Sequence, residues 1–210
     1  MRSFAPLAAT VAGAAATLAA CATAPPAAVT TFAARTCAAE PDLAGAVSLA
    51  PKKADETTVV VTTKVDGTTP CLTRNGQSGP YLVYALPAEH LGKVVMVGSV
   101  LEAARLLPPS VAVLDGAGKV TRTFPATDLF FRGPVYSVEF QPRAEDAYVL
   151  VTTDAARVGQ SYTTIAIGTQ TNSSGYVSWT SGVDQKIART FSYEGSLQAT
   201  VYGGASSAKR

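Results

Sequence analysis

The chain is poor in charged residues and in the residue types that most often perform catalysis. Only 15% of its 210 residues are charged, with a formal net charge of +2, and it contains one histidine, His90. An average soluble domain is roughly 25% charged. Nucleic-acid binding requires a clustered basic face. Because this chain has neither a basic run nor a strong positive balance, we expect no nucleic-acid partner.

The motifs that could carry chemistry are incomplete. A histidine-based triad would have to use His90, which lies in a turn-like segment at 87–92. The segment Gly76-Gln77-Ser78-Gly79 is one residue short of a nucleophile elbow, and Val120 follows Gly118-Lys119 where a phosphate-binding loop needs Ser or Thr. No calcium-loop spacing is present. The sequence therefore predicts a protein that is not an enzyme and that needs no metal or cofactor.

The first 20 residues differ in composition from the rest of the chain. One charge, Arg2, precedes an uncharged, alanine-rich stretch that ends in Leu18-Ala19-Ala20-Cys21. A charged head, an apolar middle and small residues at the cut are typical of a secretory signal peptide. We expect residues 1–20 to be removed and Cys21 to carry lipid, which would anchor the protein to a membrane. The alternative is an ordinary signal peptide followed by a chance cysteine.

The predicted mature chain has three parts. Residues 21–36, with Pro25-Pro26 and no periodicity, are expected to form a flexible tether. Residues 37–204 are expected to form one folded domain, and 205–210 a polar tail. Ala22, and not Asp, follows Cys21, so nothing marks the protein for retention at the inner membrane of a Gram-negative cell. We therefore expect it on the periplasmic face of the outer membrane.

Cys37 and Cys71 are the two cysteines that remain after Cys21. An even pair in an oxidising compartment favours a disulfide. Such a bond would hold the segment between them, which has few large apolar residues, against the domain. Two free thiols are the alternative. Metal binding is not expected, since no histidine lies near either cysteine.

Short β-strands dominate the expected secondary structure. Tyr136, Val138 and Phe140 alternate with polar residues, and turn signals such as Asn75-Gly76 and Asp115-Gly116 separate the apolar runs. Strands are expected at 57–64, 81–86, 94–101, 110–114, 119–124, 136–140, 148–151, 176–180, 188–193 and 197–202. Residues 102–107 could form one helical turn, Asp154 could cap a short helix, and 161–168 is ambiguous. We predict an all-β domain, an antiparallel β-sandwich of jelly-roll type.

Aromatic side chains are the remaining functional clue. Trp179 and Tyr176 lie in one expected strand and, if exposed, could stack on sugar rings. Trp179 shares its face with Val177, however, so a tryptophan that fills the core is the competing interpretation. Phe130-Phe131-Arg132 places two apolar side chains beside a cation in an expected loop. This second group is a candidate contact with a protein partner.

The middle of the chain contains a series of turn and strand motifs that are characteristic when taken together. They are Ser78-Gly79-Pro80, Tyr84-Ala85-Leu86-Pro87, Leu107-Pro108 with Val111-Ala112-Val113-Leu114-Asp115, Phe124-Pro125 with Phe130-Phe131, and the stretch 147–153. In these motifs residues 75–202 resemble the maltose operon periplasmic protein (MalM-like) family, most strongly over 78–153. The resemblance implies a periplasmic or outer-membrane-facing protein associated with carbohydrate uptake, and it assigns no catalytic residue. The chain departs from the family in Cys21 and in the Cys37/Cys71 pair.

Two functions are therefore expected as alternatives. The first is a non-enzymatic binding module for carbohydrate or for a component of carbohydrate transport. The second is a structural accessory lipoprotein that docks to another envelope protein. In both, the lipid on Cys21 would connect the protein to the membrane.

Overall fold

Strands make up almost all of the regular structure. The computed structural model describes residues 24–33, 35–53, 55–74, 76–166, 170–183 and 185–203. The expected signal peptide, the lipidation site Cys21, Asn75 and the expected polar tail lie outside the described residues. Sixteen strands occur in the described part of the chain: β1 (Val47–Ser48), β2 (Thr58–Val65), β3 (Cys71–Arg74), β4 (Gln77–Ala85), β5 (Lys93–Val100), β6 (Arg105–Leu106), β7 (Pro109–Asp115), β8 (Val120–Phe124), β9 (Phe130–Arg132), β10 (Val135–Phe140), β11 (Asp146–Thr153), β12 (Ser161–Ala166), β13 (Gln170–Ser173), β14 (Ser178–Ser181), β15 (Gln185–Phe191) and β16 (Gly195–Gly203).

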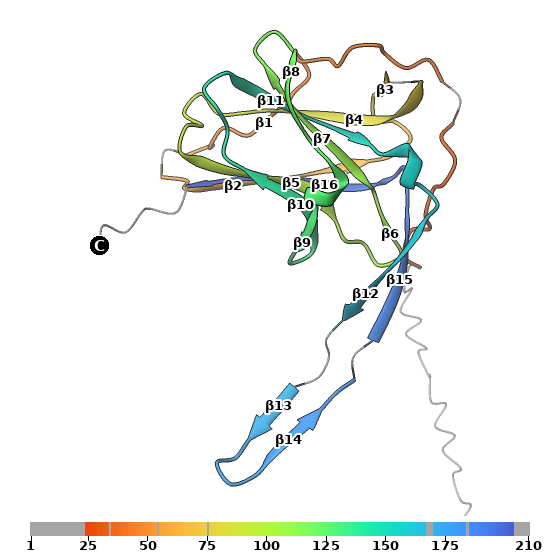
Figure 1. Cartoon of the computed structure of the whole chain (residues 1–210), viewed down its shortest axis with the longest axis vertical. Coiled ribbons are helices and arrows are strands. Elements are labelled where there is room, and N and C mark those ends of the chain that lie inside the picture. Colours follow the sequence, from red (N-terminus) through yellow and green to blue (C-terminus); the bar gives the residue numbers. More distant parts are fainter. Residues whose placement is uncertain are drawn as a thin grey trace, which may run out of the picture.

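Two sheets lie face to face as the layers of a sandwich (Figure 1). The first has the order β1-β4-β11-β7-β8, with β3 paired to β4, and the second has the order β2-β16-β5-β10-β9. Within them only the two-residue pair β1–β4 is parallel. The predicted antiparallel β-sandwich is thus confirmed, whereas its strand order does not confirm a jelly roll.

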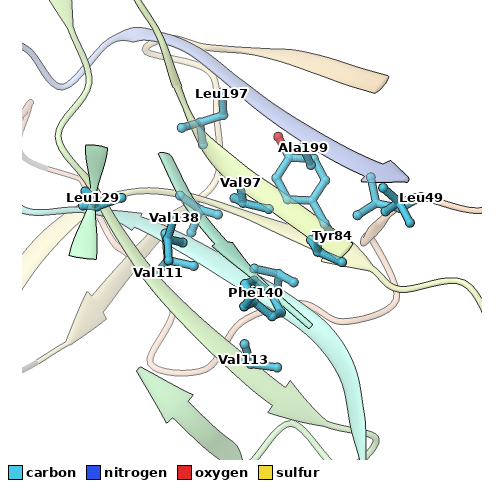
Figure 2. Packing of buried hydrophobic residues seen from close by; sticks show 14 of the residues in the cluster. Leu49, Tyr84, Val97, Val111, Val113, Leu129, Val138, Phe140, Leu197 and Ala199 are labelled. Atoms are coloured by element: carbon cyan, nitrogen blue, oxygen red, sulfur yellow. The ribbon is translucent and has the colours of Figure 1, made fainter. Parts of the chain in front are cut away.

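The core lies between the two sheets because alternate side chains of each strand point inward. Val111 and Val113 from the first sheet and Val95 and Val97 from the second are buried in one cluster. Figure 2 shows Val97, Val111 and Val113 within it. Tyr84 is also fully buried there, and burial raises the pKa of its hydroxyl to about 12. The period-two pattern of the sequence therefore identifies strands that contribute to this core.

Strands occupy two of the three segments for which the sequence indicated a helical turn or an ambiguous structure. Arg105–Leu106, inside the expected turn at 102–107, forms β6, and the ambiguous segment from 161 begins β12. Asp154 does act as a cap: its carboxylate accepts a hydrogen bond from the Ala156 N–H, at the start of the 3-10 turn Ala155–Arg157. The other 3-10 turn among the described residues is Ala126–Asp128. Arg105 and Leu106 are extended because β15 pairs with them through Thr190 and Phe191.

The predicted Cys37–Cys71 disulfide is present, with the two Cα atoms 4.9 Å apart. Beside it, Ala38 donates to the Cys71 carbonyl and accepts from the Thr73 N–H. Leu43 then packs on a second small core that covers part of the outer face of the first sheet. The buried members of this outer core are Leu72, Tyr81, Val83, Leu114 and Leu150. The disulfide therefore fixes the start of the segment that covers part of this face.

Part of the expected tether is docked on the sandwich. The Val29 N–H donates to Ser192 Oγ at 2.9 Å, and the Val29 carbonyl accepts from the Tyr193 N–H at 2.8 Å. The Phe32 ring lies 5.2 Å from the Tyr193 ring, and the Arg35 guanidinium donates to two backbone carbonyls. Val29, Phe32 and Arg35 are therefore part of the folded domain, although the sequence places them in a flexible tether.

One long hairpin projects from the sandwich, and we call residues 161–191 the arm (Figure 1). Thr164 pairs with Ile187 in β12–β15, and Asn172 pairs with Trp179 in β13–β14. Both pairings keep the same register, so the two strand pairs belong to one hairpin. At the base, β15 pairs in parallel with β6, which connects the arm to the sandwich.

Candidate functional site

A polar groove lies on the part of the outer face of the first sheet that the outer core does not cover. Its volume is about 320 Å³. Residues from five strands line it: Leu72 and Arg74 of β3, Gln77, Ser78 and Gly79 of β4, Ser110 of β7, Thr123 of β8, and Thr152 and Thr153 of β11, with Asp154 just beyond. We call this the outer groove. It exists because the outer core stops short of this part of the sheet.

Hydroxyl groups line the floor of the outer groove. Thr152 of β11 pairs directly with Ser110 of β7, so the two side chains stand on the same face. Thr123 of β8 lies one strand further on, opposite Ala112. Successive side chains of a strand alternate between faces, so a Ser or Thr at such a position is the outward counterpart of a core valine. The floor offers hydrogen-bond donors and acceptors that carry no charge.

Charged and amide groups form the rim of the outer groove. Arg74, at the end of β3, is exposed and pairs along the hairpin with Gln77. None of the ion pairs among the described residues includes Arg74. Asp154, just after β11, also borders the groove, and one of its carboxylate oxygens accepts a hydrogen bond from the Ala156 N–H. The rim therefore presents a guanidinium, an amide and a carboxylate to a ligand in the groove.

A smaller hollow of about 170 Å³ continues past Arg74. It is lined by Glu40 and Pro41 of the disulfide-held segment and by Gly118 and Val120 of the β7–β8 hairpin. Leu72 and Arg74 border both hollows. An extended ligand could therefore pass from one hollow to the other along β3.

His90 is held by the backbone on both sides of its ring. Nδ1 lies 2.8 Å from the Pro87 carbonyl oxygen and Nε2 lies 3.0 Å from the Arg143 carbonyl oxygen. These contacts join the β4–β5 loop to the β10–β11 turn. In this arrangement neither nitrogen is directed at a nucleophile, so His90 has a structural role here.

Trp179 and Tyr176 lie near the tip of the arm, far from the outer groove in the fold (Figure 1). Trp179 is 51% exposed, and the interpretation of Trp179 as a core residue is wrong. Tyr176 is fully exposed in the turn between β13 and β14, outside the strand in which it was expected. Both rings are accessible, but the structure places them on the arm and not beside the groove.

Phe130, Phe131 and Arg132 form the edge strand β9, where the sequence indicated a loop. Phe130 is 59% exposed, with the Arg132 guanidinium 5.8 Å from its ring centre. Phe131 points to the other face, and its ring lies 5.0 Å from Tyr136 and 6.0 Å from Tyr162. The two phenylalanines thus lie on opposite faces of β9: Phe130 is exposed to solvent, and Phe131 packs against the base of the arm.

Aromatic rings and a cation hold the base of the arm. Tyr162 of β12 stacks on Phe191 of β15 at 4.8 Å, and the Arg157 guanidinium lies 4.3 Å from the Phe191 ring centre. Burial raises the pKa of the Tyr162 hydroxyl to about 12, against a smaller lowering by Arg189. The arm therefore starts from a packed base and ends in an exposed tip.

Comparisons with protein families, with curated proteins and with solved structures found no match to this chain. Among the described residues, no helix is long and apolar enough to cross a membrane. Within the same residues, no group of three or more His, Cys, Asp or Glu side chains is arranged to hold a metal ion. The outer groove, the exposed edge strand β9 and the arm are the features on which the functional proposals are based.

Proposed function

We propose that the protein is a lipid-anchored lipoprotein of the cell envelope and that its sandwich is a non-enzymatic carbohydrate-binding module. The observation that carries the proposal is the outer groove, in which hydroxyl, amide, guanidinium and carboxylate groups from five strands converge. The expected membrane is the outer membrane, on its periplasmic side, through lipid on Cys21.

The chemistry of the groove suits a sugar. Each sugar ring presents several hydroxyls that both donate and accept hydrogen bonds, and Ser110, Thr123 and Thr152 can do the same. Arg74 can donate two parallel hydrogen bonds, and Asp154 can accept from a pair of hydroxyls. A volume of about 320 Å³ is at the lower end of ordinary ligand pockets. The groove therefore fits one or two sugar rings, with the smaller hollow beside Glu40 as an extension.

The proposed location has independent support. A disulfide is stable in an oxidising compartment, and the Cys37–Cys71 bond stands at the start of the folded domain. The resemblance to the MalM-like family favours the same compartment and a link to carbohydrate transport. These observations support export, and the groove supports the ligand class.

Replacing Arg74 with alanine is expected to weaken glycan binding about tenfold, because a charged hydrogen-bonding group contributes roughly 1.5 kcal/mol. Isothermal calorimetry with maltodextrins and envelope glycans measures the loss. The matched control is Arg143→Ala, which removes an exposed arginine outside the groove. If no member of either glycan class binds the wild-type protein, the carbohydrate proposal is wrong.

A second candidate function is a structural accessory that docks to another envelope protein. It is favoured by Phe130, which is exposed on the edge strand β9. Edge strands present unpaired N–H and C=O groups that can pair with another chain. A photo-crosslinking residue at position 130 should then recover one specific envelope protein from intact cells. Recovery of only bulk lipid and abundant porins would count against this function.

A further inference from the structure

We infer that the tip of the arm inserts into the interfacial layer of a lipid membrane and gives the protein a second point of attachment. The tip comprises Tyr176, Val177 and Trp179. This inference rests on the proposed lipid anchor at Cys21 for the choice of surface, and on the composition and position of the arm for the contact itself.

The exposed apolar surface of the described residues is concentrated on the arm. Five of the nine large apolar side chains that are exposed there belong to it: Ile165, Tyr176, Val177, Trp179 and Val183. Tyr176 is 100% exposed, Val183 77% and Val177 61%. Isolated exposed apolar residues are ordinary, whereas a group on one projection marks an interaction site.

The arm carries no charge over most of its length. Between Arg157 and Asp184 the sequence contains no Asp, Glu, Lys or Arg, and its polar residues are Ser, Thr, Asn and Gln. Moving such a segment toward a bilayer removes no ion from water, which would be the most costly step. Tryptophan and tyrosine prefer the headgroup level, where the ring is in apolar surroundings and the polar atom stays hydrated. An anionic partner would require a cationic surface, which this segment lacks.

The backbone of the arm limits how deeply the arm can enter a lipid bilayer. β13 and β14 pair only with each other, so each has one edge with unpaired N–H and C=O groups. Unpaired backbone groups cost several kcal/mol each in the hydrocarbon region. A single hairpin therefore stays at the interface, with the side chains at its tip reaching below the headgroups.

The described chain begins at the same end of the molecule as the arm. Val29 is hydrogen-bonded to Ser192 and Tyr193, directly after β15, and the described chain begins beside the base of the arm (Figure 1). Val29 is eight positions after Cys21, a stretch that spans at most about 29 Å. From Phe191 to Tyr176 the arm runs 15 residues, or about 50 Å. Tip and anchor can thus reach one membrane plane when the arm is inclined to it.

The test uses Trp179, the only tryptophan of the chain, as its own probe. The protein from Ala22 onward lacks the lipid but contains every residue that the structure describes. Adding vesicles of neutral phosphatidylcholine should shift the Trp179 emission to the blue. Lipids brominated near the headgroup should quench it more than lipids brominated near the chain end. The shift should be nearly independent of salt, because no ion pair contributes.

Two variants establish that the tip is responsible. Tyr176→Ser combined with Val177→Ser keeps the reporter and should weaken vesicle partitioning about tenfold or more. Leu91→Ser removes an exposed apolar side chain elsewhere and should leave partitioning unchanged. Unfolding curves in urea should coincide for the three proteins, since these side chains are exposed.

Absence of a blue shift with vesicles would overturn the inference. A blue shift that rises with protein concentration in the absence of vesicles would also overturn it, since a second copy would then cover the tip. The proposed function is tested separately: glycan affinity should be equal in the tip variant and in the wild type, and lipid on Cys21 is measured by mass spectrometry of the exported protein. Either proposal can therefore fail without the other.

Discussion

Replacing Cys37 and Cys71 together with alanine should lower the free energy of unfolding by about 3–4 kcal/mol. The disulfide closes a loop with a sequence separation of 34 residues, and the chain-entropy model gives this magnitude for such a loop. The part of this loop nearest Cys37 is held weakly: it adds Leu43 and Ala46 to the small outer core and pairs with β4 only through Val47–Ser48. The rest of the loop is anchored independently of the disulfide, since Leu49 lies in the main core and β2 pairs with β16. Urea unfolding of the oxidised wild type and of the double variant measures the difference.

Reduction provides the control for this prediction. A thiol reductant should destabilise the wild type by about the same amount and should have no further effect on the double variant. Because Cys71 begins β3 and Arg74 ends it, the reduced protein should also bind the groove ligand more weakly. Equal unfolding midpoints for oxidised and reduced wild type would contradict the prediction, and strand pairing alone would then hold the segment.

Substituting alanine for Gly98 should prevent folding or destabilise the protein by at least about 4 kcal/mol. Gly98 lies in β5, which pairs with β16 on one side and β10 on the other. A Cβ atom there would come within 2.1 Å of the Tyr136 carbonyl oxygen and 2.5 Å of the Ser137 Cα. Both are backbone atoms, so no side-chain rotation relieves the overlap. The yield of folded protein and its urea midpoint measure the effect.

Gly116 is the matched control for Gly98. A Cβ atom at Gly116, in the β7–β8 turn, meets nothing within 4 Å. Gly116→Ala should therefore change the free energy of unfolding by no more than about 0.5 kcal/mol. A Gly98→Ala protein as stable as Gly116→Ala would show that β5 and β10 can separate without loss of the fold.

Most of the strands could be predicted from local sequence patterns. Alternation in 136–140 and the β-branched run in 57–64 correspond to β10 and β2, and the Asp115-Gly116 signal corresponds to the turn between β7 and β8. These signals depend on neighbouring residues only. The segment at 102–107 was misjudged, because its extended form depends on β15, more than 80 residues away in sequence.

Trp179 shows where periodicity stops being informative. Alternation indicates which side chains share a face of a strand, but it does not indicate whether another layer covers that face. Val177 and Trp179 alternate with serine and threonine as a core strand would, yet they lie on an arm that leaves the sandwich. The exposure of Trp179 was therefore decided by the position of the whole hairpin.

The sequence by itself determined the period of the strands and most of the turns, because these depend on residue types at short spacings. It also determined the pairing of Cys37 with Cys71, because only two cysteines remain after Cys21. Only the tertiary structure decided that Ser110, Thr123 and Thr152 meet in one groove with Arg74 and that the arm projects uncovered. The groove side chains come from strands that are neighbours only after the chain has crossed between sheets. Which faces of the strands stay in contact with water is a property of the packed layers, and no local pattern encodes it.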